Sequence, residues 1–169
     1  RQLERRCFVE PDKMHQQAIE TGKRLSQRGL SLATAESCTG GWIAKVMTDI
    51  PGSSGWFDRG FVTYTNQAKQ DMLGVRAITL QQYGAVSEQT VREMAGGAIS
   101  NSRADVSVAV SGIAGPGGGS ADKPVGTVWL AWAAGNNLRT LGVHLSGDRS
   151  MVRQQAVELA LQGVLDIIG

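Results

Sequence analysis

The order of hydrophobic and polar positions predicts alternating helices and strands in the first half of the chain. Apolar residues at helical spacing predict a helix from about Pro11 to Arg28, and the glycine that follows would end it. A short apolar run from Leu30 to Ala33 predicts a strand, and a second helix face follows over residues 43–50. Alternation from Gly60 to Tyr64 predicts the next strand, which leads into a short helix that begins near Asn66.

The second half of the chain continues this alternation. Periodic apolar residues from Val91 to Ile99 predict a strong helix with Ser87 as its N-cap, and Asp148 would cap a C-terminal helix. One further segment, Val125 to Ala134, is almost continuously apolar, as a central strand covered on both faces would be. The remaining predicted strands are Val106 to Val110 and Leu141 to Leu145.

Helices flank about five strands in this pattern, which predicts an α/β fold. We expect a single-domain three-layer α/β/α sandwich that occupies residues 11–169. The length of 169 residues and the hydrophobic content of 41% are sufficient for one core and small for two. Residues 1–10 are expected outside the core as a solvated N-terminal arm.

Charge and composition argue against several classes of partner. The net charge is only +2, and no basic patch with interleaved aromatic residues follows the N-terminal arginines, so nucleic acid is not expected as a partner. No apolar run approaches the roughly 18 residues of a membrane span. Cys7 and Cys38 lie in unlike contexts, which implies no disulfide framework and suits a reducing cytoplasm. We therefore expect a cytoplasmic protein with neither nucleic acid nor a membrane as its partner.

Residues 35–41, Ala-Glu-Ser-Cys-Thr-Gly-Gly, place three candidate nucleophiles between a strand and a helix. Ser37, Cys38 and Thr39 would lie at or just before the helix N-terminus, where free N–H groups and the helix dipole favour a phosphate or a developing oxyanion. An ordinary N-cap is the alternative, but five consecutive small residues are more than a cap needs and suit a close approach by a ligand. A thiol at this place would have a lowered pKa, so Cys38 rivals Ser37 as the nucleophile.

A glycine-rich loop, Ser111 to Ser120, directly follows a predicted strand and is a second candidate site. Such a loop can present several backbone N–H groups to an anion. Its spacing matches neither the G-x-G-x-x-G pattern nor the Gly-Lys-Ser/Thr pattern of nucleotide-binding loops. An anion site and a flexible surface loop therefore both remain open for this segment.

Lys69 is a candidate base for a serine nucleophile. It falls in the first turn of the helix that begins near Asn66, where the helix dipole disfavours the ammonium and would lower the pKa of the lysine. An ordinary exposed lysine is the alternative. His15 and His144 lie away from the nucleophile motif, so a Ser-His-Asp triad is not expected and lysine or tyrosine must serve as the base. The histidines and cysteines also lack ligand spacing, so we expect no metal site.

Seven short motifs occur in order from about Met14 to the C-terminus. They are Ala35-Glu-Ser-Cys-Thr-Gly-Gly41, Pro51-Gly-Ser-Ser54, Tyr64-x-Asn66-x-x-Lys69, Gly84-Ala-Val-Ser87, Ser111-Gly-Ile-Ala-Gly-Pro-Gly-Gly118, Lys123-Pro-Val-Gly-Thr127 and Gly147-Asp-Arg149. Together they resemble the signature of the CinA C-terminal domain family. Two positions differ slightly, since Ser111 stands where many members have threonine and Thr65 where serine is common.

Stand-alone bacterial members of this family are nicotinamide mononucleotide deamidases. The resemblance therefore implies hydrolysis of the substrate carboxamide to nicotinate mononucleotide and ammonia, with no cofactor. The expected catalytic residues are Ser37 as nucleophile, Lys69 as base, and Tyr64 as a group that orients the lysine or relays its proton. The expected substrate-binding residues are Cys38, Thr39, Gly40, Asn66, Ser111, Gly112, Gly115, Gly117, Gly118 and Arg149.

Two anion sites follow from this interpretation. The N–H groups of Cys38 and Thr39 would hold the oxyanion, and the glycine-rich loop with Arg149 would bind the 5′-phosphate. The sequence leaves open which site takes which group. We also expect a homo-oligomer, a dimer. The alternative function is a noncatalytic nucleotide-binding module of the same family with a competence-related or stress-related role.

Overall fold

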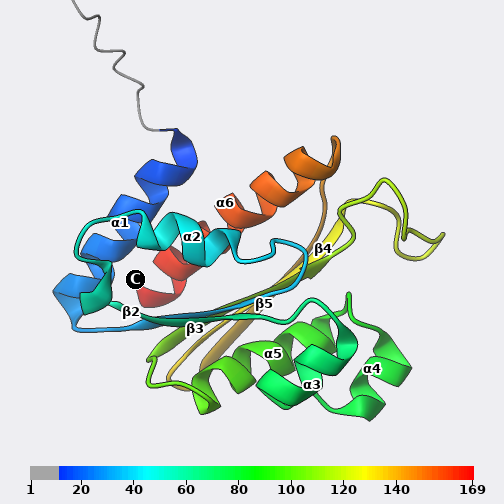
Figure 1. Cartoon of the computed structure of the whole chain (residues 1–169), viewed down its shortest axis with the longest axis horizontal. Coiled ribbons are helices and arrows are strands. Elements are labelled where there is room, and N and C mark those ends of the chain that lie inside the picture. Colours follow the sequence, from blue (N-terminus) through cyan, green and yellow to red (C-terminus); the bar gives the residue numbers. More distant parts are fainter. Residues whose placement is uncertain (1–11) are drawn as a thin grey trace, which may run out of the picture.

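A mixed five-stranded sheet forms the middle layer of the computed structural model, which describes residues 12–169 (Figure 1). The strand order is β2-β1-β3-β4-β5. The first three strands are parallel, and β4 runs antiparallel to both β3 and β5. The strands are β1 (Leu32–Glu36), β2 (Phe57–Val62), β3 (Val106–Gly112), β4 (Thr127–Ala134) and β5 (Asn137–His144). The predicted α/β sandwich with about five strands is confirmed.

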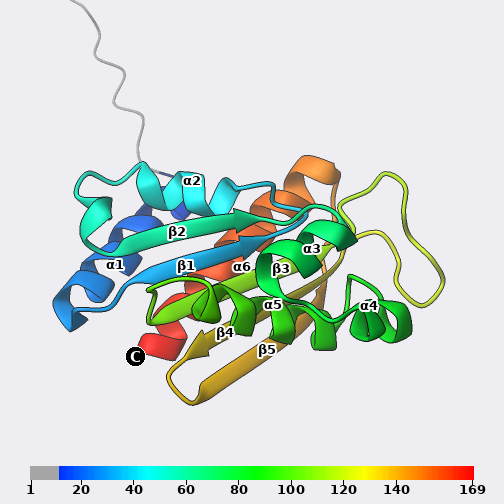
Figure 2. The same ribbon diagram turned by 60° about the horizontal axis from the view of Figure 1, so that its bottom comes forward.

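Helices cover both faces of the sheet, as the two views in Figures 1 and 2 show. On one face lie α1 (Lys13–Arg28), α2 (Trp42–Thr48) and α6 (Arg149–Ile168). On the other lie α3 (Asn66–Leu73), α4 (Ala77–Tyr83) and α5 (Glu88–Ser100). The predicted N-terminal arm, residues 1–10, and the predicted helix start at Pro11 lie outside the described residues.

The predicted helix caps are present. The Ser87 hydroxyl accepts the Thr90 N–H at 3.2 Å, and the Asp148 carboxylate accepts the Met151 N–H at 2.9 Å. Gly29 ends α1 in the left-handed conformation that glycine adopts without steric cost. Two short elements were not predicted, the helix α4 and a 3₁₀ turn, η1, over Ser53–Gly55.

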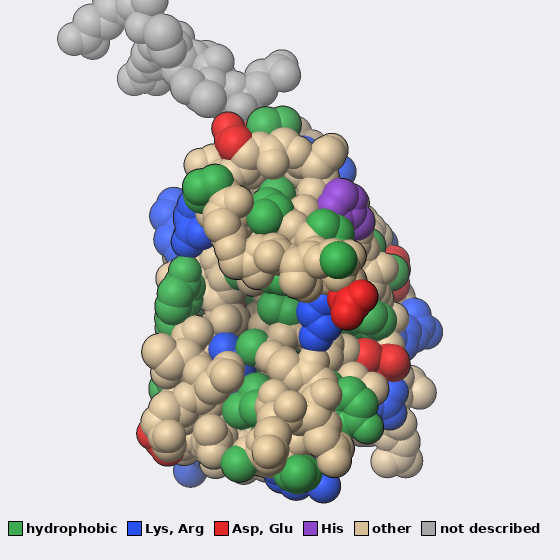
Figure 3. Space-filling view, turned by 90° about the vertical axis from the view of Figure 1, so that its right-hand side faces the viewer, with side chains coloured by type: hydrophobic (Ala, Val, Ile, Leu, Met, Phe, Trp, Pro, Cys, Tyr) green, Lys and Arg blue, Asp and Glu red, His purple; other side chains and the backbone are tan. Residues whose placement is uncertain are grey.

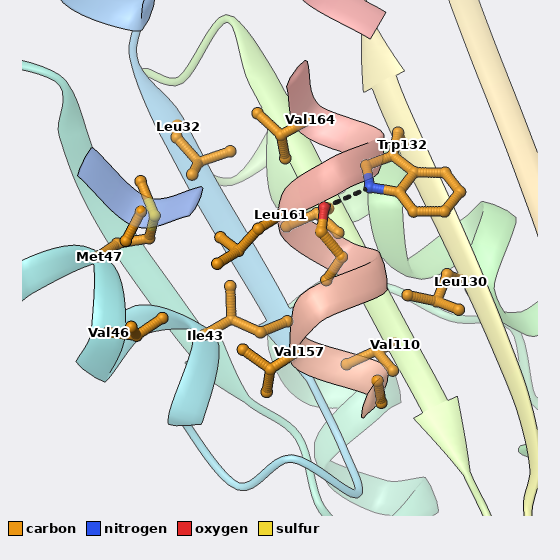
Figure 4. Packing of buried hydrophobic residues seen from close by; sticks show 14 of the residues in the cluster. Leu32, Ile43, Val46, Met47, Val110, Leu130, Trp132, Val157, Leu161 and Val164 are labelled. Atoms are coloured by element: carbon orange, nitrogen blue, oxygen red, sulfur yellow. Dashed lines mark hydrogen bonds between the residues drawn. The ribbon is translucent and has the colours of Figure 1, made fainter. Parts of the chain in front are cut away.

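The sheet separates two hydrophobic cores. The larger core fills the space between the sheet and α1, α2 and α6, and Figure 4 shows its apolar side chains around Leu161. Within it the Trp132 indole N–H donates to the Ala160 carbonyl at 2.9 Å, which satisfies the one polar group of that ring. The smaller core lies between the sheet and the helices of the opposite face. Every layer of the sandwich is therefore fixed by buried packing.

Alternation along β1 sends its side chains to opposite cores. Leu32 belongs to the larger core and Ala33 and Ala35 to the smaller one. The same alternation directs Glu36 towards α2 and the next residue, Ser37, towards α3. Because β1 lies between β2 and β3, the loops that follow these parallel strands meet at one end of the sheet, at the right in Figure 1.

Candidate active site

The side chains of Ser37 and Lys69 meet at the carboxyl end of β1. Lys69 Nζ lies 3.0 Å from Ser37 Oγ. Both residues are buried, with 8% of Ser37 and 1% of Lys69 exposed. Lys69 lies in the first turn of α3, as predicted, and Thr65 caps this helix by accepting the Ala68 N–H at 3.0 Å. The structure thus brings the predicted nucleophile and the predicted base within hydrogen-bonding distance.

The backbone of the chain orients the Lys69 amine. Nζ donates to the Thr63 carbonyl at 2.8 Å and lies 3.5 Å from the Tyr64 carbonyl. A neutral amine has two N–H groups, which these carbonyls can accept, and one lone pair, which is then left for the proton of the Ser37 hydroxyl. The arrangement therefore suits an amine that takes a proton from Ser37.

Burial lowers the pKa of Lys69 from its ordinary value of 10.5 to about 8. Desolvation disfavours the charged ammonium, and a neutral amine is the form that can act as a base. The direction of the shift agrees with the prediction, and burial is its largest cause.

A cavity of about 210 Å³ opens beside this pair. Figure 3 looks onto this end of the molecule, where the surface is hollowed between an upper and a lower part. Two of the described lining residues, Lys69 and Arg149, are basic and none is acidic, so the cavity favours a polar or anionic ligand. The lining residues are Ser37, Cys38, Tyr64, Lys69, Ala85, Val86, Ser111, Gly112, Ala114 and Arg149.

The nucleophile turn, residues 37–41, depends on its two glycines. Gly40 has φ +60° and Gly41 has φ +97°, both in the left-handed region that other residues rarely adopt. The turn therefore needs glycine at these two positions for its backbone conformation. Close approach by a ligand, which the sequence suggested as the reason for small residues, is not required to explain them.

A buried carboxylate, Glu36, occupies the N-terminus of α2. It is 0% exposed, and its oxygens accept the Thr39 hydroxyl at 2.7 Å, the Ile43 N–H at 2.8 Å and the Ala44 N–H at 3.0 Å. The N–H groups of Ile43 and Ala44 at this helix N-terminus are therefore not available to a phosphate or an oxyanion, because Glu36 already accepts them and balances the helix dipole.

Cys38 lines the cavity but is not an activated thiol. It is 6% exposed, and burial raises the pKa of the thiol to about 11. The predicted lowering of its pKa is wrong, because desolvation outweighs the nearby positive charge and α2 begins only at Trp42. The geometry favours Ser37 over Cys38 as the nucleophile.

Tyr64 contacts Arg149 rather than the lysine. The Arg149 guanidinium donates to the Tyr64 hydroxyl at 3.0 Å and to the Gly115 carbonyl at 2.9 Å, which joins two loops to the start of α6 at the rim of the cavity. Tyr64 is 57% exposed, and only its backbone carbonyl lies near Lys69. Its hydroxyl therefore does not orient the lysine in this structure, and the Thr63 carbonyl has that role.

The remaining predicted binding residues divide into two groups. Ser111 and Gly112 line the cavity, and Gly115 lies at its rim through its carbonyl. Those that do not line it are Thr39, which is fully buried, and Gly40, Asn66, Gly117 and Gly118, which are exposed.

Sequence reasoning missed several residues of this site. Glu36, Ala85, Val86 and Ala114 lie inside the seven motifs, but no role was assigned to them, and the Thr63 carbonyl beside Lys69 was not expected. Arg153 lies outside every motif, and it donates to the Cys38 carbonyl at 3.0 Å and the Thr39 carbonyl at 3.2 Å. No pattern of spacing signals this contact, because 115 residues separate Arg153 from Cys38.

Neither histidine belongs to the site. His144 contacts the Val125 carbonyl at 2.9 Å, and His15 lies in α1. Within residues 12–169 no group of three or more His, Cys, Asp or Glu side chains is arranged to hold a metal ion. In the same residues, none of the helices combines the length and apolarity required to cross a membrane.

Comparison with known proteins identifies close relatives. The sequence profile described as the CinA C-terminal domain matches residues 14–168. "Nicotinamide-nucleotide amidohydrolase PncC" of Escherichia coli (strain K12) is 59% identical over 145 residues, which cover 85% of this chain and 87% of that protein. The protein of the same name from Enterobacter agglomerans is 56% identical over 154 residues, which cover 90% and 94%. The crystal structure of the competence/damage inducible protein CihA from Agrobacterium tumefaciens has a TM-score of 0.92 at 48% identity, covering 94% of this chain and 98% of that one.

Proposed function

Since the chain belongs to the CinA C-terminal domain family, we propose that it is a nicotinamide-nucleotide amidohydrolase, as its relatives named PncC are. It converts nicotinamide mononucleotide to nicotinate mononucleotide and ammonia, and its nucleophile is Ser37. The observation that carries this proposal is the 3.0 Å contact between Ser37 Oγ and Lys69 Nζ, with the pKa of the lysine lowered to about 8.

The reaction proceeds through an acyl-enzyme. Ser37 Oγ forms a bond to the amide carbon while its proton passes to the neutral Lys69 amine. The carbon–nitrogen bond then breaks, and Lys69 returns the proton to the departing nitrogen, which leaves as ammonia. Water attacks the acyl-enzyme with Lys69 as its base, which releases the carboxylate product and restores Ser37. Each proton that Lys69 accepts is given back, so the cycle needs no other acid or base.

Backbone N–H groups of the nucleophile turn stabilise the oxyanion. Within the described residues, the N–H groups of Cys38 and Thr39 donate to no other residue. The Ser37 carbonyl accepts the Gly40 N–H at 3.0 Å, so the planar peptide directs the Cys38 N–H out of the turn. Cys38 lines the cavity and Thr39 does not, which makes the Cys38 N–H the principal donor. One such donor contributes about 3 kcal/mol to transition-state stabilisation.

Arg149 binds the 5′-phosphate. Its guanidinium lines the cavity and contacts only two neutral acceptors among the described residues, so its charge is free to pair with an anion. The N-terminus of α2 does not compete for the phosphate, because Glu36 occupies it. The Tyr64 hydroxyl supports Arg149, and a proton relay through Tyr64 stays a prediction.

Ammonia release from nicotinamide mononucleotide by the purified protein tests this function. We expect ammonia and nicotinate mononucleotide in equal amounts, and neither from Ser37→Ala. The ribonucleoside that lacks the phosphate should be a poor substrate, because it does not engage Arg149. Tight binding of the mononucleotide without any turnover would contradict the proposal and support the noncatalytic nucleotide-binding module.

A further inference from the structure

Two arginines one helical turn apart at the start of α6 contact different parts of the site. Arg149 lines the cavity, whereas Arg153 does not. Arg153 Nε donates to the Cys38 carbonyl at 3.0 Å, and a terminal nitrogen of the same guanidinium donates to the Thr39 carbonyl at 3.2 Å. Arg153 therefore contacts the nucleophile turn, and of the two arginines only Arg149 lines the cavity.

The contacts of Arg153 complete the set of bonds that fixes the peptide groups beside Ser37. The Cys38 and Thr39 carbonyls point to the guanidinium, and the Ser37 carbonyl accepts the Gly40 N–H at 3.0 Å. Three successive carbonyls of the turn are thus engaged. Because each peptide is planar, the two Arg153 bonds fix the N–H groups of Thr39 and Gly40, and the bond from Gly40 to the Ser37 carbonyl in turn fixes the Cys38 N–H, which faces out of the turn.

The surroundings of Arg153 suit a guanidinium. Its planar fork offers two donors at a fixed spacing, which matches two neighbouring carbonyls. It lies over the Trp42 ring, 5.5 Å from the ring centroid. Within residues 12–169 Arg153 forms no ion pair, so the turn and the Trp42 ring are its main partners.

We propose that Arg153 is a positioning residue, which holds the nucleophile turn so that Ser37 Oγ and the Cys38 N–H face the same substrate carbonyl. This inference rests on the proposed function. Arg153 touches neither the substrate nor the reacting atoms, so its loss should lower kcat and leave KM nearly unchanged. Arg149 touches the ligand, so its loss should chiefly raise KM.

Steady-state kinetics of matched variants test this difference. In Arg153→Met, which keeps the aliphatic stem over Trp42, we expect kcat to fall about 100-fold with KM within about threefold of the wild type. In Arg149→Met we expect KM to rise roughly tenfold or more. Arg139→Met, on the exposed strand β5, is the surface control and should match the wild type.

A measurement without substrate separates this inference from the proposed function. Backbone ¹⁵N order parameters of residues 38–40 should fall from about 0.85 towards about 0.6 in Arg153→Met and stay high in Arg149→Met. If the wild type releases no ammonia, the proposed function fails, and the order parameters still decide whether Arg153 holds the turn.

Two results would overturn the role of Arg153. One is an Arg153→Met enzyme whose turn keeps its order and whose kcat lies within about threefold of the wild type. The other is a rise in KM with kcat unchanged, which would make Arg153 a ligand-binding residue. If Arg153→Met does not fold, Arg153→Lys takes its place, since an ammonium lacks the two-donor fork and should still lower kcat about tenfold.

Discussion

The nucleophile turn and the glycine-rich loop are both built from small residues, but the turn is largely buried, whereas the second half of the loop is exposed. Ser37, Cys38 and Thr39 are buried, and Glu36 and Arg153 both contact the turn. Residues 116–120 of the loop are exposed, and Ser120 and Lys123 make the bonds at its far end. A run of glycines therefore does not by itself distinguish a buried turn from an exposed loop.

The proposed function gives each segment a different role. In that proposal the turn holds Ser37 Oγ and the Cys38 N–H in place, and Glu36 and Arg153 contact its backbone or side chains. The loop lies at the rim of the cavity, where we propose that it meets the ligand. We accordingly expect substitutions in the turn to change chemistry, and substitutions in the loop to change binding or nothing.

The largest expected effect comes from removing the nucleophile from the turn. Ser37→Ala should lower kcat by at least about 10⁴-fold, because no other group can form the acyl-enzyme, while substrate affinity stays largely intact. Cys38→Ala should keep most of the activity, since the pKa of that thiol is raised. Ammonia release and equilibrium binding measure the two quantities, and the reverse pattern would make Cys38 the nucleophile.

The next largest effect concerns the base that faces the turn. Below pH 8 Lys69 is protonated, so kcat/KM in the wild type should rise about tenfold per pH unit and level off above an ionisation near 8. In Lys69→Met this ionisation should disappear from the pH profile, and the activity should fall about 10³-fold. Lys69→Arg should be almost as inactive, because a guanidinium keeps the charge but accepts no proton. Substantial turnover by the arginine variant would mean that the position supplies only charge.

The same ionisation links the stability of the fold to pH. The pKa of Lys69 is about 8 in the folded protein and 10.5 ordinarily, so the unfolded chain binds more protons between these values. The buried lysine therefore destabilises the fold by about 3 kcal/mol at pH 7, and this cost disappears as pH rises to 10.5. Urea unfolding measures this effect. The free energy of unfolding of the wild type, relative to that of Lys69→Met, should rise by about 3 kcal/mol between pH 7 and pH 10.5.

The smallest effect compares one glycine of each segment. Gly41 has φ +97°, so Gly41→Ala should lower the free energy of unfolding by about 1–2 kcal/mol and also reduce kcat. Gly117 lies in the loop, where an added Cβ would meet nothing within 4 Å, so Gly117→Ala should change stability by less than about 0.5 kcal/mol. Equal effects in urea unfolding would remove the distinction between the two segments.

Most of the fold could be predicted because its elements carry local signals. Apolar periodicity and cap residues such as Ser87 and Asp148 place helices α5 and α6. Helix α4 lacks these signals, since it spans seven residues and its N-cap, Arg76, makes no side-chain capping bond. The pairing of β4 between β3 and β5 arises from contacts across the sheet, which local patterns do not contain.

The site was predictable where residue type reveals chemistry. Ser37 and Lys69 could be singled out because a serine needs a base and neither histidine lies near the motif. Glu36 could not be, because its carboxylate accepts N–H groups seven and eight residues ahead, a spacing that no local capping pattern has. The contact of the Lys69 amine with the Thr63 carbonyl was equally hidden, because it depends on how α3 packs beside β2.

The contact between Ser37 and Lys69 joins the two sides of the sandwich. The turn that carries Ser37 packs through Cys38 into the larger core, and α3, which carries Lys69, packs through Leu73 into the smaller one. A slight sliding of one layer over the other would separate the two atoms while every helix and strand stays intact. Substitutions deep in either core can therefore tune turnover from a distance, which gives evolution and protein engineering a way to adjust the rate without altering any residue that meets the substrate.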